Sequence, residues 1–507
     1  MKSNYTQDVQ FDSAFGALQT PAHLFTAALL NGTAAAPVNC HFRYLDVACG
    51  NGLTLSLLAE AYPFADFVGI DINEKHIEEA RSRAEAACMT NISFVQGDLA
   101  TVTAEEFEPF DYCAIVGVYS WLDAYRRKRA REFIKNVVKP GGLVYLDYSS
   151  QPGMAQTAPL YHMIKQIGAV CDGDSAQQLA SASSLLNRMR EGGARFFEQN
   201  NGASARLAGI LQNPPADEAH EVFNLQEMAL WSSEVIESLE EEGFRYVGSS
   251  ILHQNMSGVT SPSVLPKESS QLPLALRQLL QDVAWNVAHR NDLYVNGNTP
   301  ESADLQLTLL DSFPYVAPGA LNEANLKGLS KAFPRVDFTS RPVVSVTHAA
   351  KRAQTFGDLY ELASQEGISA TEITEVVTIL LAARVLSVAI TPIKNQPTGE
   401  KLSMPSKLNR MILMEDISQE HARPFASPVV GTRVLMPIRD RVYVWALVLG
   451  DVGKAWDAMG ELREAFRGDR GEPLNRSQFV EVVSDSMVNF EKTAVPELLR
   501  LGILEYQ

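Results

Sequence analysis

The chain has 507 residues, a formal net charge of −17, a hydrophobic fraction of 46% and a charged fraction of 20%. This length predicts two to four domains, and the composition excludes a disordered or fibrous protein. Because an acidic chain repels phosphate backbones, we expect no nucleic-acid partner. The five cysteines form no C-x-x-C pair, and neither a signal core nor an apolar stretch of membrane-spanning length is present. We therefore expect a cytoplasmic protein without a membrane span. The nine histidines do not form ligand-spaced clusters, so no metal site is expected.

Short apolar runs alternate with helix-like stretches in the first part of the chain. This alternation predicts an α/β fold, with a parallel sheet and helices on its faces. The expected strands are residues 44–47, 67–70, 92–95, 112–116 and 143–147. Asn73 is expected to cap the helix that follows the second strand.

The alternation stops near residue 154. Residues 154–215 are helical and polar in pattern, which predicts a helical insertion, and residues 244–249 are expected to end the same sheet. A stretch rich in Ser, Pro and Gly then indicates a linker. We expect a first domain at 1–255, a linker and middle region at 256–340, and a mostly helical C-terminal part at 341–507. Two helix-rich stretches there end in short apolar runs, typical of winged-helix modules; they are residues 356–390 and 479–506.

The first expected strand runs into a glycine loop that contains Ala48, Gly50 and Gly52, directly after Asp46. A ligand is expected at the carboxyl end of such a strand, where glycine lets the backbone approach it. The loop reads G-x-G-x-x-L and lacks the third glycine of a dinucleotide fingerprint, which disfavours a pyrophosphate ligand. A ligand with a carboxylate in place of a pyrophosphate fits better.

Acidic residues follow the next two expected strands. Asp71, followed by Ile72, stands 25 positions after Asp46, where a carboxylate can accept hydrogen bonds from ribose hydroxyls. Asp98, followed by Leu99, is placed to accept a hydrogen bond from an adenine amino group. The three loops at one sheet edge thus predict a nucleoside site.

These residues resemble the class I S-adenosylmethionine-dependent methyltransferases. The family's D-x-G-x-G-x-G loop, its acidic second strand end and its G-D at the third are matched here, with Ala48 in place of the usual first glycine. The matching positions are Asp46, Gly50, Gly52, Asp71 and Asp98. The resemblance implies a Rossmann-like sheet, methyl transfer and S-adenosylmethionine as the cofactor.

A second group of residues narrows the resemblance. Gly117, Tyr119 and Trp121 follow the fourth strand in the order G-V-Y-S-W, and residues 18–24 precede the sheet. Both stretches look like the bacterial protein-lysine methyltransferases of the rickettsial outer-membrane-protein type, which carry a methyltransferase regulatory domain. The likeness covers roughly residues 15–350. It implies a lysine side chain of a protein as the methyl acceptor, and a homodimer.

Several site assignments stay open at this stage. Tyr119 and Trp121 are the candidate catalytic residues, because two aromatic rings can enclose an amine, but ordinary packing beneath the insertion is equally compatible. Gln19 and Thr20, with His23, either begin a helix or close a lid over the cofactor. Gly117 is expected beside the cofactor. Tyr119 is a candidate acceptor for the amine proton, Asp147 and His162 are further candidates for a general base, and nothing in the spacing selects among them.

Two other functions remain compatible with the sequence. One is methylation of a glycan or a small secondary metabolite, since the same sheet serves many acceptors. The other is a catalytically silent cofactor-binding or assembly partner, because residues 270–507 show no catalytic signature. A basic run between residues 126 and 131 either steers an acidic partner or, as is usual for charge runs on helices, forms a solvated face.

Overall fold

The computed structural model describes most of the chain. The described residues are 8–9, 15–99, 101–224, 229–256, 264–297, 313–317, 329, 333, 335–350, 355–392, 399, 401–415, 422–449, 452–458, 466–467 and 472–507. Part of the expected linker and middle region, 256–340, including 257–263 and 298–312, therefore lies outside them. Among the described helices, none combines the length and apolar character needed to cross a membrane.

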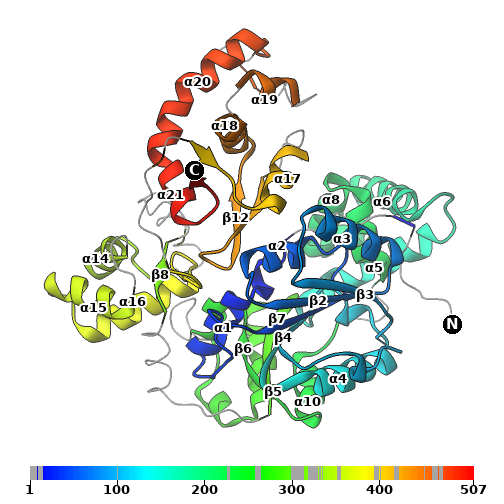
Figure 1. Cartoon of the computed structure of the whole chain (residues 1–507). Helices are drawn as coiled ribbons and strands as arrows, with labels where there is room; N and C mark the ends of the chain where they lie inside the picture. The colour runs from blue at the N-terminus through cyan, green and yellow to red at the C-terminus, as the bar shows by residue number, and fades with distance from the viewer. Residues whose placement is uncertain are drawn as a thin grey trace.

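A seven-stranded sheet in the order β3-β2-β1-β4-β5-β7-β6 forms the centre of the first half of the chain (Figure 1). The first five strands in the chain are parallel, and β7 runs antiparallel to both β5 and β6. Their bounds are β1 Arg43–Val47, β2 Asp66–Asp71, β3 Ile92–Gln96, β4 Phe110–Ile115, β5 Val138–Ser149, β6 Phe244–Ser249 and β7 His289–Asn296. The predicted Rossmann-like sheet is confirmed, and all six strands expected from the sequence are present.

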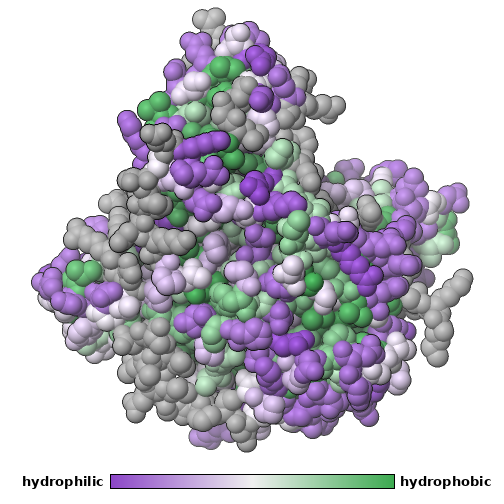
Figure 2. Space-filling model, in the orientation of Figure 1, coloured by the Kyte–Doolittle hydropathy of each residue, from purple (hydrophilic) through white to green (hydrophobic). Residues whose placement is uncertain are grey.

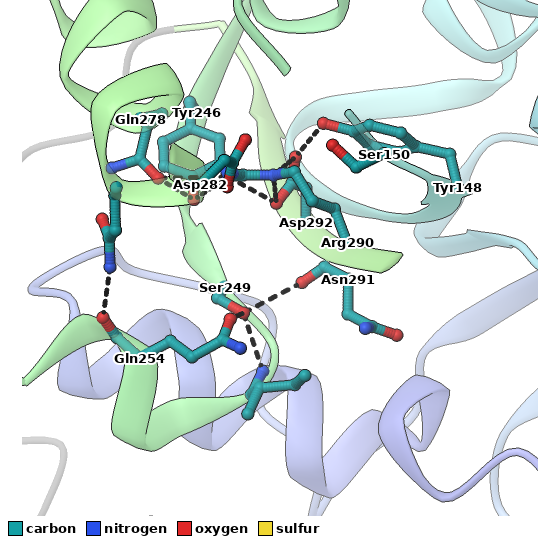
Figure 3. A network of polar contacts seen from close by, with 12 residues as sticks. Tyr148, Ser150, Tyr246, Ser249, Gln254, Gln278, Asp282, Arg290, Asn291 and Asp292 are labelled. Atoms are coloured by element: carbon teal, nitrogen blue, oxygen red, sulfur yellow. Dashed lines mark hydrogen bonds and ion pairs between the residues drawn. The ribbon is translucent and has the colours of Figure 1, made fainter. Parts of the chain in front are cut away.

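The seventh strand, β7, was not expected, because its first residues are polar and give no apolar alternation. Three of these polar side chains, Arg290, Asn291 and Asp292, are buried among polar partners (Figure 3). The guanidinium of Arg290 lies 2.6 Å from a carboxylate oxygen of Asp282 and 3.0 Å from Asp292. Tyr148 on β5 donates to Asp292 at 2.7 Å, and Arg290 donates to the Tyr246 hydroxyl at 3.0 Å. Buried charges are tolerated when they are paired in this way, so the network lets a polar segment occupy the middle of the sheet.

Helices cover both faces of the sheet. The core on one face includes residues of α1 (Pro21–Leu30), α2 (Leu53–Ala61) and α3 (Glu74–Ala86). The core on the other includes residues of α4 (Ala124–Val137), α10 (Ser232–Glu241) and α11 (Leu274–Trp285). The predicted cap of α3 is confirmed, because the Asn73 side chain accepts a hydrogen bond from the backbone N–H of Lys75. The short 3₁₀ helices are η1 Ala17–Gln19, η2 Ala104–Glu106, η3 Tyr119–Trp121, η4 Gly153–Gln156, η5 Leu252–Asn255 and η6 Lys267–Gln271.

The helical insertion follows β5 and has a hydrophobic core of its own. Its helices are α5 Ala158–Gly168, α6 Ser175–Glu191, α7 Arg195–Gln199, α8 Asn201–Gln212 and α9 Pro215–Asn224. After the insertion the chain returns to its starting point, where Leu230 forms a parallel bridge with Ser150. The insertion therefore stands at the carboxyl end of β5, beside the edge that the sequence predicts to bind the cofactor.

Among its described residues, the C-terminal part is mainly helical and contains the short antiparallel strand pairs β8–β9, β10–β13 and β11–β12. Its hydrophobic core is continuous with the α1 and α2 face of the sheet, and β11 and β12 contact α2. Each of the two stretches expected to resemble a winged helix contains two helices followed by a short strand. The winged-helix assignment itself stays a prediction. Hydrophilic residues cover much of the face shown in Figure 2, with smaller hydrophobic patches between them. The bounds are β8 Tyr315–Val316, α14 Arg341–Ala349, α15 Phe356–Gln365, α16 Ala370–Ala382, β9 Ser387–Val388, β10 Leu402–Ser403, α17 Lys407–Glu415, β11 Arg423–Ser427, β12 Thr432–Met436, α18 Ile438–Leu449, α19 Val452–Ala458, α20 Arg476–Thr493, α21 Val495–Arg500 and β13 Glu505–Tyr506.

The division of the chain into domains stays a prediction. The sheet itself continues past residue 255, because it takes β7 from residues 289–296.

Candidate active site

The glycine loop after β1 is held in a left-handed backbone conformation. Ala48, Gly50 and Gly52 have φ values of 65°, 57° and 71°. A φ near 60° favours glycine and costs other residues about 1 to 2 kcal/mol, so the strain falls on Ala48. The backbone N–H of Ala48 donates to the carbonyl of Ile70 at 2.8 Å, which fixes the loop to β2 despite that strain.

Asp71, at the end of β2, holds the same loop from the other side. One carboxylate oxygen accepts from the N–H of Gly50 at 2.9 Å, and the other accepts from Asn73 at 2.8 Å. His76 Nδ1 lies 3.5 Å from the second oxygen. A carboxylate oxygen can accept more than one hydrogen bond, so Asp71 can still accept hydrogen bonds from ribose hydroxyls.

Asp46 is a buried carboxylate with an unused acceptor. Its side chain is 2% exposed, and Oδ1 has no hydrogen-bond partner within the described part of the chain. Burial, with the charges of Asp71 and Asp147, raises the pKa of Asp46 to about 8. A buried acceptor without a donor is costly unless a ligand supplies one. The loop therefore fits a ligand with a hydrogen-bond donor, such as the amino group of S-adenosylmethionine.

The expected adenine-binding residues lie at the next strand end. Asp98 and Leu99 follow β3, and Gly97 donates to the Asp71 carbonyl at 3.0 Å. Leu99 is buried, whereas Asp98 and Ile72 are partly exposed. The structure thus brings the three acidic residues of the sequence prediction to one edge of the sheet.

The segment before the sheet contacts this edge. The N–H of Gly16 donates to Thr54 at the start of α2, and the Tyr44 hydroxyl donates to the Gln19 carbonyl at 2.8 Å. The Gln19 Oε1 atom is buried without a partner among the described residues. The expected helix start is present, because α1 begins at Pro21 with Thr20 at its N-cap position, although the Thr20 side chain donates to the Ala17 carbonyl and forms no cap hydrogen bond. The lid role of Gln19 and Thr20 stays a prediction.

Gly117, after β4, is exposed beside an open space. It has a φ of 67°, and a Cβ placed on it would meet no atom within 4 Å. Its N–H donates to Asp147 Oδ1 at 2.6 Å, and Asp147 Oδ2 lies 3.7 Å from His289 Nε2. Burial lowers the pKa of His289, but the paired Asp147 outweighs this effect and holds it above its ordinary value. Sequence reasoning missed His289, because it begins a strand whose first four residues are polar.

The two candidate catalytic residues, Tyr119 and Trp121, do not form an open aromatic cage. Tyr119 is buried in the core on the α4 face, with its ring centroid 6.4 Å from that of Tyr148. Its hydroxyl accepts from Arg131 at 3.1 Å. Trp121 is partly buried and packs against the insertion core, and His162 is exposed on α5. Packing is thus what the structure shows for Tyr119, and catalytic roles for Tyr119 and Trp121 stay predictions.

Two arginines of the basic run on α4 form ion pairs with acidic residues three positions away in the chain. Arg126 pairs with Asp123 at 2.7 Å, and Arg129 pairs with Glu132 at 2.7 Å. These pairs fit a helix face satisfied by its own neighbours, and the choice between the two expected interpretations stays a prediction.

Comparison with known proteins identifies the fold and the reaction class. A methyltransferase domain family matches residues 39–201, which hold the glycine loop, Asp71 and Asp98. The chain is an S-adenosylmethionine-dependent methyltransferase. A second family, described as a predicted methyltransferase regulatory domain, matches residues 219–296 of this methyltransferase, a stretch that contains β6, α11 and β7. The sheet is therefore completed by two strands, β6 and β7, from this second segment.

Relatives and solved structures extend the likeness to the whole enzyme. The uncharacterized protein sll1526 of Synechocystis is 24% identical over 98% of this chain and 99% of its own length. The uncharacterized protein RP789 of Rickettsia prowazekii is 31% identical, but over only 30% of this chain and 27% of its own. The structure of PKMT2 from Rickettsia typhi matches with a TM-score of 0.71 at 15% identity, over 97% of this chain and 100% of that one. The same protein in complex with AdoHcy matches with a TM-score of 0.69 at 17% identity, over 94% of this chain and 98% of that one. At these identities the structural likeness concerns the fold.

Proposed function

We propose that this methyltransferase transfers a methyl group from S-adenosylmethionine to a lysine nitrogen of a protein substrate. The observation that carries the proposal is the position of Asp147, whose carboxylate lies 2.6 Å from the N–H of Gly117 beside open space. A negative charge beside the transfer position attracts a cationic amine and disfavours an anionic acceptor. The likeness in fold to PKMT2, a name that denotes a protein-lysine methyltransferase, supports the same acceptor.

The cofactor is held by the residues at the carboxyl edge of the sheet. We assign the methionine part to Asp46, Ala48, Gly50 and Gly52, with Gln19 and Thr20 above them. Asp71 and Ile72 bind the ribose, and Asp98 and Leu99 bind the adenine. When bound, the cofactor supplies an electrophilic methyl group on a sulfonium, so the protein must mainly align the acceptor and exclude water. Gly117 brings the backbone close to the transfer position.

The protein substrate and the acceptor atom are tested together. The purified enzyme is incubated with radioactive S-adenosylmethionine and a heat-denatured bacterial protein extract, and the labelled protein is hydrolysed to amino acids. The proposal expects the label in methylated lysine. Label in base-labile esters, or only in the small-molecule fraction, would overturn it and favour the alternative of a small-metabolite or glycan acceptor. A homodimer remains an expectation and is tested by light scattering.

A further inference from the structure

The first residues of β7 lie close to the loop that follows β4, because both contact the end of β5. Ser149 on β5 lies opposite His289 in the register of the antiparallel pair. The backbone N–H of Ser149 donates to the Ser120 hydroxyl at 2.7 Å, and both serines are buried. The N–H of Ser150 donates to the Ala288 carbonyl at 2.8 Å. These contacts bring the start of β7 to the loop where the acceptor is expected.

Asp147 joins this loop to His289. Alternate residues of a strand share one face, so Asp147 lies on the same face of β5 as Ser149 and diagonally across from His289. One carboxylate oxygen accepts from the Gly117 N–H at 2.6 Å, and the other lies 3.7 Å from His289 Nε2. The side chain of Asp147 is 11% exposed and that of His289 is 51% exposed. A covered carboxylate therefore holds an imidazole that a substrate can reach.

The two ring nitrogens of His289 have different surroundings. Nε2 faces the Asp147 carboxylate, whereas Nδ1 forms no hydrogen bond with any described residue. A carboxylate favours the proton on the nitrogen that faces it, so the neutral ring keeps an acceptor lone pair on Nδ1. The same carboxylate stabilises the imidazolium that forms when Nδ1 takes a proton. The pair thus has the parts of a general base and its orienting group.

A second histidine–aspartate pair provides a contrast. His41 Nε2 lies 3.1 Å from Asp66 Oδ2, and these side chains are 64% and 52% exposed. Asp66 is the first residue of β2, so the pair lies at the end of the sheet opposite the carboxyl edge. An exposed ion pair of this kind contributes little to stability. It is therefore a matched control that has the same groups but is remote from the cofactor edge.

We propose that His289 is the general base of the reaction, that it takes a proton from the ammonium group of the acceptor lysine beside Gly117, and that Asp147 orients it. This inference rests on the proposed function. The proton moves from the ammonium nitrogen to His289 Nδ1, and the neutral amine then attacks the methyl carbon. The carbon–nitrogen bond forms as the carbon–sulfur bond breaks, and the bonding electron pair goes to sulfur. The methylated amine keeps one positive charge, and the imidazolium gives its proton to water.

The charges around His289 suit this role. Burial lowers its pKa, but the carboxylates of Asp147, Glu221 and Asp292 act in the opposite direction, and the net effect is a rise above the ordinary value of 6.5. A base with a pKa near the working pH can both take a proton and release it within one turnover. The general base then comes from the segment that the second family matches.

The test compares three variants of the full-length enzyme with the wild type. His289→Gln removes the base, Asp147→Asn removes the orienting charge but keeps an oxygen that accepts from Gly117, and His41→Gln is the control. The initial rate of methylated-lysine formation is measured with saturating S-adenosylmethionine and a heat-denatured bacterial protein extract. The pH is varied from about 6 to about 10, the range over which histidine and lysine titrate. The affinity for S-adenosylhomocysteine and the melting temperature are measured for each variant.

At neutral pH, His289→Gln should be about 100-fold slower than the wild type, the usual contribution of a positioned base. This deficit should shrink towards pH 10, because a large share of the lysine is then already the neutral amine. The wild-type rate should rise with pH as His289 loses its proton. That rise should be absent in His289→Gln and should move to lower pH in Asp147→Asn. His41→Gln should match the wild type at every pH, and both histidine variants should keep the cofactor affinity and the melting temperature.

Two results would overturn the inference while the proposed function stands, because methylated lysine still forms in the wild type. One is an unchanged rate in His289→Gln at neutral pH. The other is a deficit of the same size at neutral pH and at pH 10, which would assign His289 a structural role. If the wild type forms no methylated lysine, the proposed function itself fails and this inference fails with it.

Discussion

The carboxylate of Asp71 accepts a hydrogen bond from the backbone N–H of Gly50 at 2.9 Å. The residue expected to bind the ribose therefore also sets the shape of the glycine loop. Binding and loop geometry are coupled through one side chain, which makes Asp71 the most sensitive position of the cofactor site.

Asp71→Ala should raise the dissociation constant for S-adenosylhomocysteine about 100-fold or more, since it removes a charged hydrogen-bond acceptor and frees the loop. Isothermal titration calorimetry measures the effect. Asp71→Asn is the control, because its amide oxygen still accepts from Gly50 and the loss should be smaller. Equal affinities for the wild type and Asp71→Ala would remove Asp71 from the cofactor site.

Cofactor affinity should depend on pH through Asp46, whose pKa is raised to about 8 by burial and by the neighbouring carboxylates. Near pH 7 its side chain is mainly protonated, and the amino group of the ligand favours the ionised form. Binding then releases a proton, so the dissociation constant for S-adenosylhomocysteine should fall as pH rises from 6 to 8. Calorimetry in buffers of different ionisation enthalpy detects the released proton. The pH dependence should disappear in Asp46→Asn, and its persistence there would assign the effect to another group.

The same carboxyl makes the protein without cofactor sensitive to pH. Because the pKa of Asp46 is higher in the folded chain than the ordinary value of 3.8, the folded state binds the proton more tightly. The stabilisation is present at low pH and is lost as pH rises from about 4 to about 8. Asp46→Asn should flatten this part of the stability curve, measured by urea unfolding at several pH values. Identical curves for variant and wild type would contradict the raised pKa.

Gly52→Ala should destabilise the enzyme by a steric clash as well as by backbone strain. A Cβ there would lie 2.6 Å from the Phe94 ring and 2.8 Å from the Ala80 methyl group. Gly32→Ala is a matched control, because Gly32 has the same φ of 71° and nothing within 4 Å of the added atom. Both variants should lose about 1 to 2 kcal/mol through the left-handed conformation, and Gly52→Ala about 1 to 3 kcal/mol more. Denaturant unfolding checks the difference. Equal losses would show that the loop relaxes around the methyl group.

Arg290→Met should cost about 3 to 5 kcal/mol of unfolding free energy, because it leaves two buried carboxylates without their cation. Asp282 and Asp292 flank the guanidinium in the network between the sheet and α11 (Figure 3). The exposed Arg277 on the same helix provides the control, and Arg277→Met should change stability by less than about 0.5 kcal/mol. Thermal unfolding followed by circular dichroism measures both. A small effect at Arg290 would mean that the carboxylates become protonated or hydrated at little cost.

The sequence by itself determined the cofactor half of the site. Six strands were predictable from their apolar runs, and the five parallel ones place their carboxyl ends at one edge, so Asp46, Asp71 and Asp98 had to meet there. The glycine loop was also predictable from the local sequence, because a left-handed φ favours glycine whatever surrounds it.

Only the tertiary structure decided the acceptor half. The first half of strand β7 is polar, and its buried polar side chains are satisfied by partners such as Tyr148, which is 144 positions away from Asp292 in the chain. The same long-range packing brings His289 to Asp147, and places Tyr119 in the core on the α4 face. These contacts join residues that are far apart in the sequence. Local sequence patterns therefore predict the cofactor site but not the acceptor site.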